Sequence, residues 1–414
     1  MLLSIIISLI FTLLLGIIFG TITGLIPGIH INLISIILIS FLSTLLQITT
    51  PLNLVVFIIA MSITHTFIDY IPSIFLGAPD EDSFLSILPG HRMLLKGHGF
   101  AAVTLTLYGS LTALIIILIF TPLFITILPI IYPYIQTLMP FILIIISIYL
   151  IYNESEYEKD YPIQKITNAL FIFLLAGFLG IASLNLPIDQ PLLPLLTGLF
   201  GTSTLLISIK NKIKIPKQKI LKLNQIKLSR KSFLQATKAS IIASPFTAFL
   251  PGLGASQAAV IGKQSAKELD SRGFLFLLGA INTIVMGLSF ITLYTIGKTR
   301  TGSALAVSQI LSELTIKNLA IILTTINLTG ILAFILAISL AKLSAKYITK
   351  FNYTKISKVI ILVLVILTLY FTGILGLLVL ITATSLGIYT ITKQIKRIHL
   401  MGCLIIPTIL FYMF

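Results

Sequence analysis

Three long stretches of this sequence contain no charged residue. Residues 1–68, 101–153 and 359–392 lack Lys, Arg, Asp and Glu altogether. About 20 consecutive apolar residues are enough for a helix to cross the hydrocarbon core of a bilayer, and each stretch is longer than that. Since a lipid-exposed backbone must satisfy its own hydrogen bonds, these stretches predict membrane-spanning helices. They exclude a soluble enzyme, a disordered chain and a secreted disulfide scaffold.

The composition sets the scale of the bundle. Only 10% of the residues are charged, against roughly 25% in a soluble domain. Spans of about 20 residues with short connections give roughly 10 to 14 crossings in 414 residues, with a pair of spans expected over 358–391. We therefore expect an all-α integral membrane protein, a polytopic helical bundle that crosses the cytoplasmic membrane many times.

The remaining charges are strongly clustered. Of the 28 Lys and Arg residues, ten lie in 210–238, five in 342–358 and three in 393–397, and none of these segments contains an acid. This pattern is typical of cytoplasmic loops, where Lys and Arg accumulate, and it favours contact with membrane lipid. The segments lack the features that nucleic-acid recognition needs, so no nucleic-acid partner is expected.

Two kinds of polar break recur in the two halves of the chain. A Pro-Gly break at 24–30 has a counterpart at 249–256, and a Gly-led polar break at 77–83 has a counterpart at 297–303. The separation along the chain is nearly the same for both pairs. Paired interruptions of apolar segments in corresponding halves point to a transporter binding site. The breaks predict two internal repeats, which we expect to be inverted, with Pro-Gly-broken helices and re-entrant hairpins.

These repeats define the expected domains. Residues 1–209 form the first transmembrane repeat, 210–238 a basic cytoplasmic linker, and 239–414 the second transmembrane repeat. Proline removes a backbone donor and disrupts its helix, so each Pro-Gly break exposes backbone groups that must face protein or water. The alternative interpretation is a proline kink in a packed helix, or a loop at the membrane surface.

The residues at the two Pro-Gly breaks are the first candidates for substrate binding. Half-helix N-termini bind anions, and the polar side chains that follow can hydrogen-bond a solute; capping of the new helix is the alternative role. The candidates are Pro27, Gly28, His30, Asn32, Pro251, Gly252, Gly254 and Ser256.

Charged residues near the second pair of breaks extend the predicted site. Lys298 and Arg300 are expected to attract an anionic substrate, since charges at membrane depth are expensive and are kept mainly for function. The acids expected to take a coupling H⁺ or Na⁺ are Asp80, Glu81, Asp82 and Asp69. Asp69 follows His65 by four residues, which places both on one helical face and suits a proton relay. Solvated surface loops, and for Asp69 an interhelical hydrogen bond, are the alternatives.

Other chemistry finds no support in the sequence. The chain has no GxxxxGK[ST], HExxH, CxxC or G-x-S-x-G pattern and a single cysteine, Cys403, so ATPase, zinc-protease and hydrolase motifs are missing. We expect no enzymatic activity, no metal site, and no cofactor other than a coupling ion.

These motifs together resemble the large membrane subunit of tripartite tricarboxylate transporters and its archaeal-type relatives. The Pro-Gly breaks at 24–28 and 250–255 are similar to those that open each half in that family. The polar hairpin at 77–83, with Pro89–Met93 and Lys96–Gly99 after it, and the segment 192–200 resemble further family stretches. The chain departs at 298–301, where the family has an Ile-Pro-Gly-Ser type hairpin, and at Asp80, where the family has Gly.

The resemblance implies a secondary-transport permease for organic anions, with a small membrane subunit and a solute-binding protein as partners. The expected function is transport of a small carboxylate-type anion by ion-coupled alternating access. A translocase for an anionic lipid carrier or head group uses the same hairpins and cations and is the alternative. An intramembrane enzyme with paired acids such as Asp69 and Asp80 is a third class, without a recognised motif.

Overall fold

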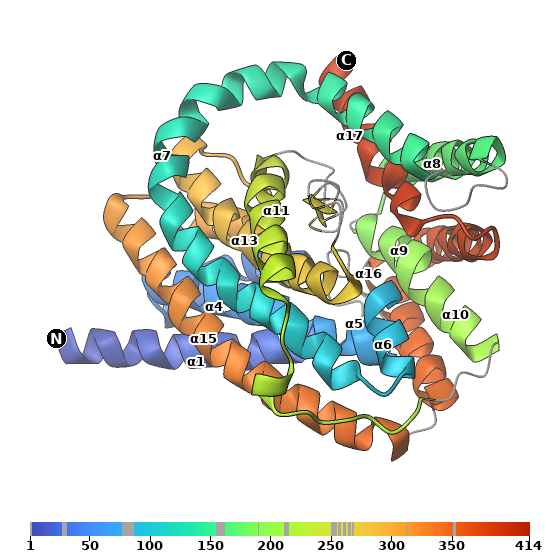
Figure 1. The fold of residues 1–414 in the computed structure, drawn as a ribbon. Helices are drawn as coiled ribbons and strands as arrows, with labels where there is room; N and C mark the ends of the chain where they lie inside the picture. Colours follow the sequence, from blue (N-terminus) through green and yellow to red (C-terminus); the bar gives the residue numbers. More distant parts are fainter. Residues whose placement is uncertain are drawn as a thin grey trace. The chain divides into compact units, whose positions relative to one another are not determined.

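Helices make up the regular structure of the computed structural model (Figure 1). It describes residues 2–26, 31–76, 87–154, 162–188, 190–210, 215–249, 255, 258–259, 262–263, 266, 269–311, 313–350 and 353–414. These described residues contain no strand, as expected for an all-α membrane protein. They form two compact units. Unit 1 is built from the described parts of 1–130, 215–249 and 255–350, and unit 2 from those of 131–214 and 351–414.

The helices of unit 1 are α1 (Leu2–Leu25), α2 (Ile31–Ser40), α3 (Leu42–Ile48), α4 (Pro51–Ile68), α5 (Tyr70–Leu76), η2 (Ile87–His91), α6 (Arg92–Leu95), η5 (Leu223–Gln225), α11 (Arg230–Phe249), α13 (Ser271–Ile296), α14 (Gly302–Ile310), α15 (Ile316–Tyr347) and η6 (Ile348–Lys350). Those of unit 2 are α8 (Pro162–Leu184), α9 (Leu192–Leu196), η4 (Thr197–Thr202), α10 (Ser203–Lys210), α16 (Tyr353–Thr392), η7 (Arg397–Met401) and α17 (Gly402–Met413). Helix α7 (Gly99–Tyr152) contributes to both units.

Eight helices in the described part are long and apolar enough to cross a membrane. Two of them are much longer than one crossing needs. Helix α7 has 54 residues and is about 80 Å long, against a hydrocarbon core of about 30 Å. Helix α16 has 40 residues and is interrupted at Gly373. The eight long helices can therefore supply more than eight crossings of the membrane.

Helix α16 is a hairpin of two helical arms. Gly373 has φ 64° and ψ −160°, a combination that only glycine adopts readily. Leu364 of the first arm lies 4.0 Å from the position of a Cβ on Gly201, and Ala383 of the second arm lies against Gly198. Because Gly198 and Gly201 are one helical turn apart, both arms return to the same place. The structure thus agrees with the pair of spans expected over 358–391.

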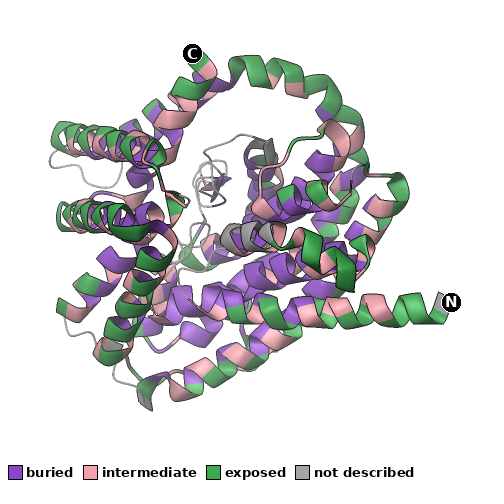
Figure 2. Cartoon of the chain, turned by 180° about the vertical axis from the view of Figure 1, so that it is seen from behind, coloured by how far each residue is buried: buried purple, intermediate pink, exposed green. Residues whose placement is uncertain are grey.

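Two matched helices form the centre of unit 1. The α4–α5 segment, Pro51–Leu76, and α13, Ser271–Ile296, each have 26 residues and are almost entirely buried. The side chains of Thr50 and Asp270 cap them by accepting hydrogen bonds from backbone N–H groups in the first turn. Figure 2 shows the buried residues in purple, with the N-terminal stretch of α1 extending beyond them.

The two central helices cross in opposite directions. Thr66 Oγ1 lies 3.5 Å from Thr283 Oγ1, and the Tyr70 hydroxyl donates to the Leu278 carbonyl at 3.0 Å. The residue number rises along α4–α5 while it falls along α13, so the helices are antiparallel. Both contacts lie near the middle of the α13 sequence.

Helix α1 packs parallel to α4 through three glycines, Gly16, Gly20 and Gly24. A Cβ on Gly20 would lie 2.4 Å from the Met61 carbonyl oxygen, so glycine is needed for this close approach. A Gly-xxx-Gly stripe of this kind lets membrane helices bring their backbones together. Since α1 and α4 run in the same direction, α2 and α3 carry the chain back between them.

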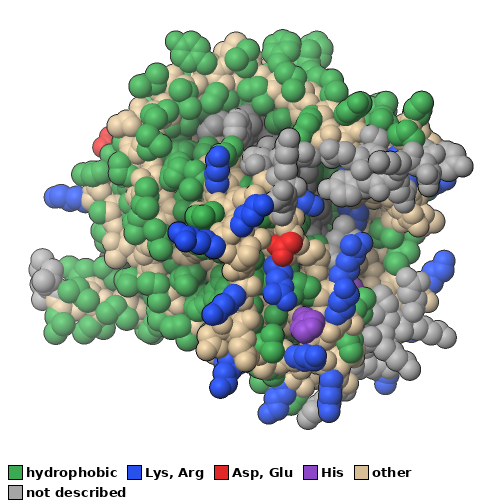
Figure 3. Space-filling view, viewed as in Figure 1, with side chains coloured by type: hydrophobic (Ala, Val, Ile, Leu, Met, Phe, Trp, Pro, Cys, Tyr) green, Lys and Arg blue, Asp and Glu red, His purple; other side chains and the backbone are tan. Residues whose placement is uncertain are grey.

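A basic segment marks one end of unit 1. The chain around Gln218 lies against the start of α7, where Lys219 N donates to Gly97 O and Gly99 N donates to Gln218 Oε1, each at 2.8 Å. Figure 3 shows Lys and Arg side chains gathered on the lower part of the face in view. Ser232 Oγ donates to Asp270 Oδ1 at 3.4 Å, which places the start of α13 at this same basic end. The antiparallel α4 starts at the opposite end.

The expected repeats, 1–209 and 239–414 with the linker 210–238, stay a prediction. The central helices begin at Pro51 and Ser271 and end at Leu76 and Ile296, so their separation along the chain is the same at both ends. It also equals the separation between the glycines that lead the two polar breaks, Gly77 and Gly297. Each compact unit draws on both halves of the chain.

Candidate functional site

Most of the predicted site residues lie outside the described part of the chain. These are Pro27, Gly28, His30, Asp80, Glu81, Asp82, Pro251, Gly252, Gly254 and Ser256. Asn32 lies in the first turn of α2, where the backbone alone is described. The structure places the other three in unit 1: Lys298 is exposed, Arg300 is half-buried just before α14, and Asp69 is buried between α4 and α5.

The chain reverses after α13 so that α14 begins beside the body of that helix. Gly297 ends α13 in the left-handed conformation, with φ 64°, which glycine adopts at little cost. Thr301 then caps α14 by accepting a hydrogen bond from Ala304 N at 3.2 Å. The Thr301 hydroxyl also lies 3.0 Å from the Ser289 hydroxyl. Ser289 is seven residues before the end of α13, or about 10 Å back along its axis.

Hydroxyl groups from three further positions meet at the first turn of α14. Ser62 Oγ of α4 lies 2.6 Å from Ser303 Oγ, and Ser35 Oγ of α2 lies 3.2 Å from it. All three side chains are fully buried. We call Ser35, Ser62, Ser289, Thr301 and Ser303 the hydroxyl cluster. It fixes the N-terminus of α14 to both central helices.

This arrangement suits a small anion. A helix N-terminus carries a partial positive charge and favours anionic groups, and serine and threonine hydroxyls can donate hydrogen bonds. Arg300, one residue before the cap, adds a permanent positive charge beside the cluster. The combination of donors and positive charge in a buried setting can bind a carboxylate.

None of the five members of the hydroxyl cluster is among the site residues predicted from the sequence. Ser303 ends the second Gly-led break, so its position in that motif was a usable signal. Ser35 shares the apolar helix α2 with Ser40, and Ser62 is followed in α4 by Thr64 and Thr66. Nothing in their sequence context distinguishes Ser35 and Ser62 from these neighbouring hydroxyls. Their convergence depends on the packing of α2, α4 and α14.

Asp69 lies in a polar seam between the two central helices. Its Oδ2 atom accepts a hydrogen bond from Asn282 Nδ2 at 3.3 Å, and each side chain is only 3% exposed. The contact between Thr66 and Thr283 lies next to it. The expected relay partner, His65, has its Nδ1 atom 3.1 Å from Thr23 Oγ1 of α1. An interhelical hydrogen bond of Asp69, the simpler of the two sequence interpretations, is therefore present.

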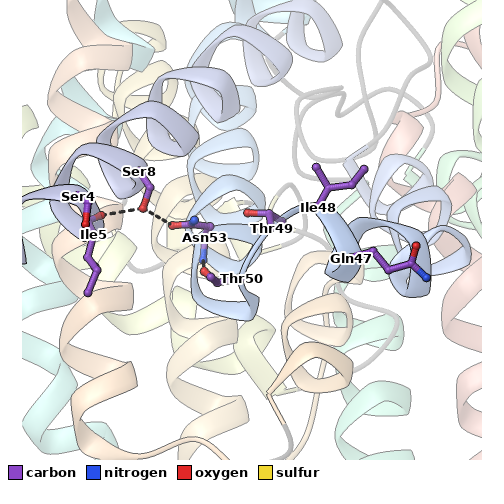
Figure 4. A pocket seen from close by; sticks show the side chains of 8 residues that line it. All are labelled: Ser4, Ile5, Ser8, Gln47, Ile48, Thr49, Thr50 and Asn53. Carbon is purple, nitrogen blue, oxygen red and sulfur yellow. Dashed lines mark hydrogen bonds between the residues drawn. The ribbon is translucent and has the colours of Figure 1, made fainter. Parts of the chain in front are cut away.

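An open cavity of about 510 Å³ lies apart from these groups, at the starts of α1 and α4 (Figure 4). Its polar lining includes Ser8, whose hydroxyl lies 3.3 Å from Asn53 Oδ1. The full lining is Ser4, Ile5, Ser8, Gln47, Ile48, Thr49, Thr50 and Asn53. Within the described part of the chain, neither a sequence-predicted site residue nor a charged side chain belongs to this lining.

Unit 2 contains a buried ionic cluster of its own. Glu154 Oε2 lies 3.0 Å from His399 Nε2 and 3.2 Å from Lys396 Nζ. Burial would raise the pKa of Glu154, but the hydrogen bond and charge of His399 and the charge and backbone N–H of Lys396 together hold it below its ordinary value of 4.5. The cluster ties the end of α7 to the segment before α17. Glu154 is bonded to both Lys396 and His399, which indicates a structural role.

A half-buried arginine next to this cluster, Arg397, stabilises a π-helical turn. The guanidinium of Arg397 donates to Thr204 Oγ1 at 2.6 Å and to the Leu199 carbonyl at 3.1 Å, and it also donates to the Phe200 carbonyl. A π-helical turn, here η4, disturbs the regular backbone hydrogen bonds of a helix. Arg397 therefore satisfies carbonyl groups in an apolar environment. Across the described residues, no three His, Cys, Asp or Glu side chains converge as metal ligands.

Comparison with known proteins places these features in a family. A family model described as the tripartite tricarboxylate transporter TctA family matches residues 10–402. The uncharacterized protein MJ1079 of Methanocaldococcus jannaschii is 32% identical over 371 residues, which cover 87% of this chain and 89% of that protein. No solved structure matches the chain.

Proposed function

Because the chain belongs to the tripartite tricarboxylate transporter TctA family, we propose that it is a secondary-transport permease for a small organic anion. The family model covers nearly the whole chain, and the eight apolar helices make it a multi-pass protein of the cell membrane. The transported solute carries at least one carboxylate and crosses by ion-coupled alternating access. The protein transports the solute without converting it chemically.

The observation that carries this proposal is the hydroxyl cluster at the N-terminus of α14. Ser62 and Ser303 approach to 2.6 Å and are fully buried, in a segment where polar groups are costly. With Arg300 beside them, they supply the donors and the charge that a carboxylate needs. Lys298, which is exposed, adds a second positive charge that attracts anions toward the site.

The course of the chain around α14 supports a re-entrant hairpin. Thr301 lies beside Ser289 after the chain has already passed Ile296 at the end of α13. The chain must therefore turn back along α13 before α14 starts. We place the substrate at the tip of this hairpin, together with the Pro-Gly breaks at Pro27-Gly28 and Pro251-Gly252 and the nearby His30, Asn32, Gly254 and Ser256.

The antiparallel crossing of α4–α5 with α13 supports inverted repeats. Helices that correspond in two inverted repeats run in opposite directions, and alternating access in such transporters is a movement of one repeat against the other. The equal lengths of the two segments, and their constant separation along the chain, favour this correspondence. Asp69, Asp80, Glu81 and Asp82 are the proposed ion-coupling acids.

The family suggests two protein partners. Tripartite systems combine the large membrane subunit with a small membrane subunit and a solute-binding protein, and we propose both as partners here. The basic segments within 210–238, 342–358 and 393–397 are proposed to contact anionic lipid on the cytoplasmic side.

Counterflow in proteoliposomes tests the proposal. Vesicles that contain the purified protein and unlabelled citrate should take up [¹⁴C]citrate or another labelled di- or tricarboxylate. Ser303→Ala and Arg300→Ala should reduce this exchange at least tenfold, and replacement of Pro27-Gly28 by Ala-Ala should abolish it. Ser339→Ala is the matched control, because Ser339 is exposed on α15. Full exchange by Arg300→Ala would refute the site, and translocation of a lipid phosphate without acid exchange would favour a lipid-carrier translocase.

A further inference from the structure

The seam between Asp69 and Asn282 lies deep within the apolar part of unit 1. Asp69 is about 8 Å from the middle of the α4–α5 segment, and Asn282 is about 2 Å from the middle of α13, counted along each helix axis. The hydrocarbon core extends about 15 Å to either side of its midplane. Both side chains are 3% exposed. A carboxyl group at this depth lies within the hydrocarbon core and is shielded from bulk water by the protein around it.

The neighbouring described elements place few ionisable groups near Asp69. Helices α1, α2 and α14, which pack against α4, contain none. The ionisable groups of α13 and α15 lie near the ends of these helices. They are Arg272 and Tyr294 on α13, and Lys317, Lys342, Lys346 and Tyr347 on α15. On its own segment Asp69 is accompanied by His65, which contacts Thr23, and Tyr70, which donates to Leu278 O. His91 of η2, beyond α5, contacts the Ile74 carbonyl.

The chemistry of the Asp69–Asn282 pair suits a proton better than a metal cation. Asn282 directs an N–H group at Asp69 Oδ2, and the two side chains together contain three oxygen atoms, fewer than the roughly six ligands that a hard metal cation takes. A side-chain amide has both donors and an acceptor. By turning its amide, Asn282 can donate to the carboxylate or accept a hydrogen bond from the carboxylic acid. One partner thus satisfies both protonation states of Asp69 in a dry environment.

The seam is connected to the hydroxyl cluster along both central helices. Ser62 precedes Asp69 by seven residues, and Thr66 lies between them on the same helical face. On α13, Ser289 follows Asn282 by seven residues. Ser62 contacts Ser303, and Ser289 contacts Thr301. Each central helix therefore contributes one side chain to the seam and, about 10 Å farther along its axis, another that contacts the start of α14.

We propose that Asp69 carries the proton that couples transport of the anion, and that Asn282 is its positioning residue in both protonation states. Asp69 takes up a proton from water on one side of the membrane and releases it to water on the other. On uptake an O–H bond of hydronium breaks while the O–H bond of the carboxylic acid forms, and release to water on the other side is the reverse exchange. This inference rests on the proposed function, to which it adds the identity of the ion and of its carrier.

Infrared spectroscopy of the purified protein tests proton binding without any substrate. A pH titration should show a carboxylic-acid C=O band that is lost in Asp69→Asn. In Asn282→Ala the band should remain but shift in frequency, because the protonated acid loses its acceptor. Asn327→Ala is the control, since Asn327 bonds within its own helix α15 and its loss should leave the band unchanged. A titration in which Asp69→Asn removes no band would overturn the proposal even if transport is observed.

Transport in two modes then separates coupling from substrate binding. Citrate counterflow requires no net proton movement, whereas accumulation of [¹⁴C]citrate driven by a pH gradient in Na⁺-free buffer does. Asp69→Asn should retain counterflow within about twofold and lose at least nine-tenths of the accumulation, and Asp69→Glu should recover part of it. Accumulation that depends on a Na⁺ gradient and is unchanged in Asp69→Asn would refute the proposal. If the wild-type protein shows neither counterflow nor accumulation of citrate, citrate is refuted as the substrate. The infrared titration then still decides the role of Asp69.

Discussion

At the scale of single residues, polar side chains have two different functions in this protein. In unit 2, Glu154, Lys396, His399 and Arg397 bind one another or backbone carbonyls. In unit 1, the hydroxyl cluster and the Asp69–Asn282 pair join side chains of different helices through hydrogen bonds. The first group stabilises the fold, and the second is where we place binding and proton transfer.

The Glu154 cluster predicts a pH-dependent stability. Its lowered pKa means that the carboxylate stabilises the fold fully above pH 4.5 and that this contribution is lost as the pH falls through the lowered value. Glu154→Gln should therefore lower the stability at neutral pH by about 2 kcal/mol, and the difference should disappear as the pH falls below 4.5 and through the lowered pKa. Thermal unfolding in detergent across this range measures it. Glu313→Gln, which changes an exposed acid, is the control. A stability difference between wild type and Glu154→Gln that does not vary with pH would contradict the prediction.

The sequence could reveal some of the site residues and not others. Asp69 was predicted because it is an isolated acid that directly follows the charge-free stretch 1–68. Arg300 and Lys298 were predicted because they interrupt an apolar region. Ser35 and Ser62 could not be predicted, since their significance comes from tertiary contacts with Ser303 that connect residues 268 and 241 positions apart.

At the scale of elements, helix directions are determined by small residues and special backbone angles. The Gly16, Gly20 and Gly24 stripe allows α1 to lie parallel and close to α4. Gly373 lets α16 fold back into a hairpin, and the Pro-rich sequence of α7 still forms one continuous helix of 54 residues. The long apolar stretches predicted that these helices exist. Their directions depend on close contacts between elements, which the sequence pattern alone does not specify.

The glycine stripe predicts a sharp asymmetry between two faces of α1. Gly20→Leu should destabilise the protein by about 3 kcal/mol, because its Cβ would lie 2.4 Å from a backbone carbonyl oxygen that cannot move aside easily. Ile18→Leu, on the exposed face of the same helix, should change stability little. Thermal unfolding in the same detergent compares the stability of Gly20→Leu with that of Ile18→Leu. Equal stability of the two variants would show that α1 does not pack on α4 through this stripe.

At the scale of the whole molecule, the basic segments and the helix directions together predict how unit 1 lies in the membrane. The segment around Gln218 marks the cytoplasmic end, and the start of α13 lies there because Ser232 contacts Asp270. Since α4 is antiparallel to α13, its start faces the other side of the membrane. Lys342 and Lys346 place the C-terminal end of α15 on the cytoplasmic side as well.

Cysteine labelling tests this orientation. Cys403 is the single cysteine and is buried, so Cys403→Ser gives a cysteine-free background. In intact cells a membrane-impermeant maleimide should label Gln47→Cys and Glu313→Cys, and it should label Lys222→Cys and Arg272→Cys only after the cells are opened. Labelling of Gln47→Cys and Arg272→Cys from the same side would contradict the antiparallel arrangement.

The matched dimensions of α4–α5 and α13 have an energetic consequence. Two helices with the same length, the same kind of N-cap and nearly complete burial contribute similar packing free energy on either side of their crossing. We therefore expect that the movement proposed for alternating access, which exchanges their roles, leaves the free energy of the scaffold nearly unchanged. In such a degenerate two-state system, a few kcal/mol of differential affinity for a solute or a proton is enough to shift the populations. Under the proposed alternating access, the similarity of the two central helices therefore predicts that weakly bound cargo is enough to shift the populations.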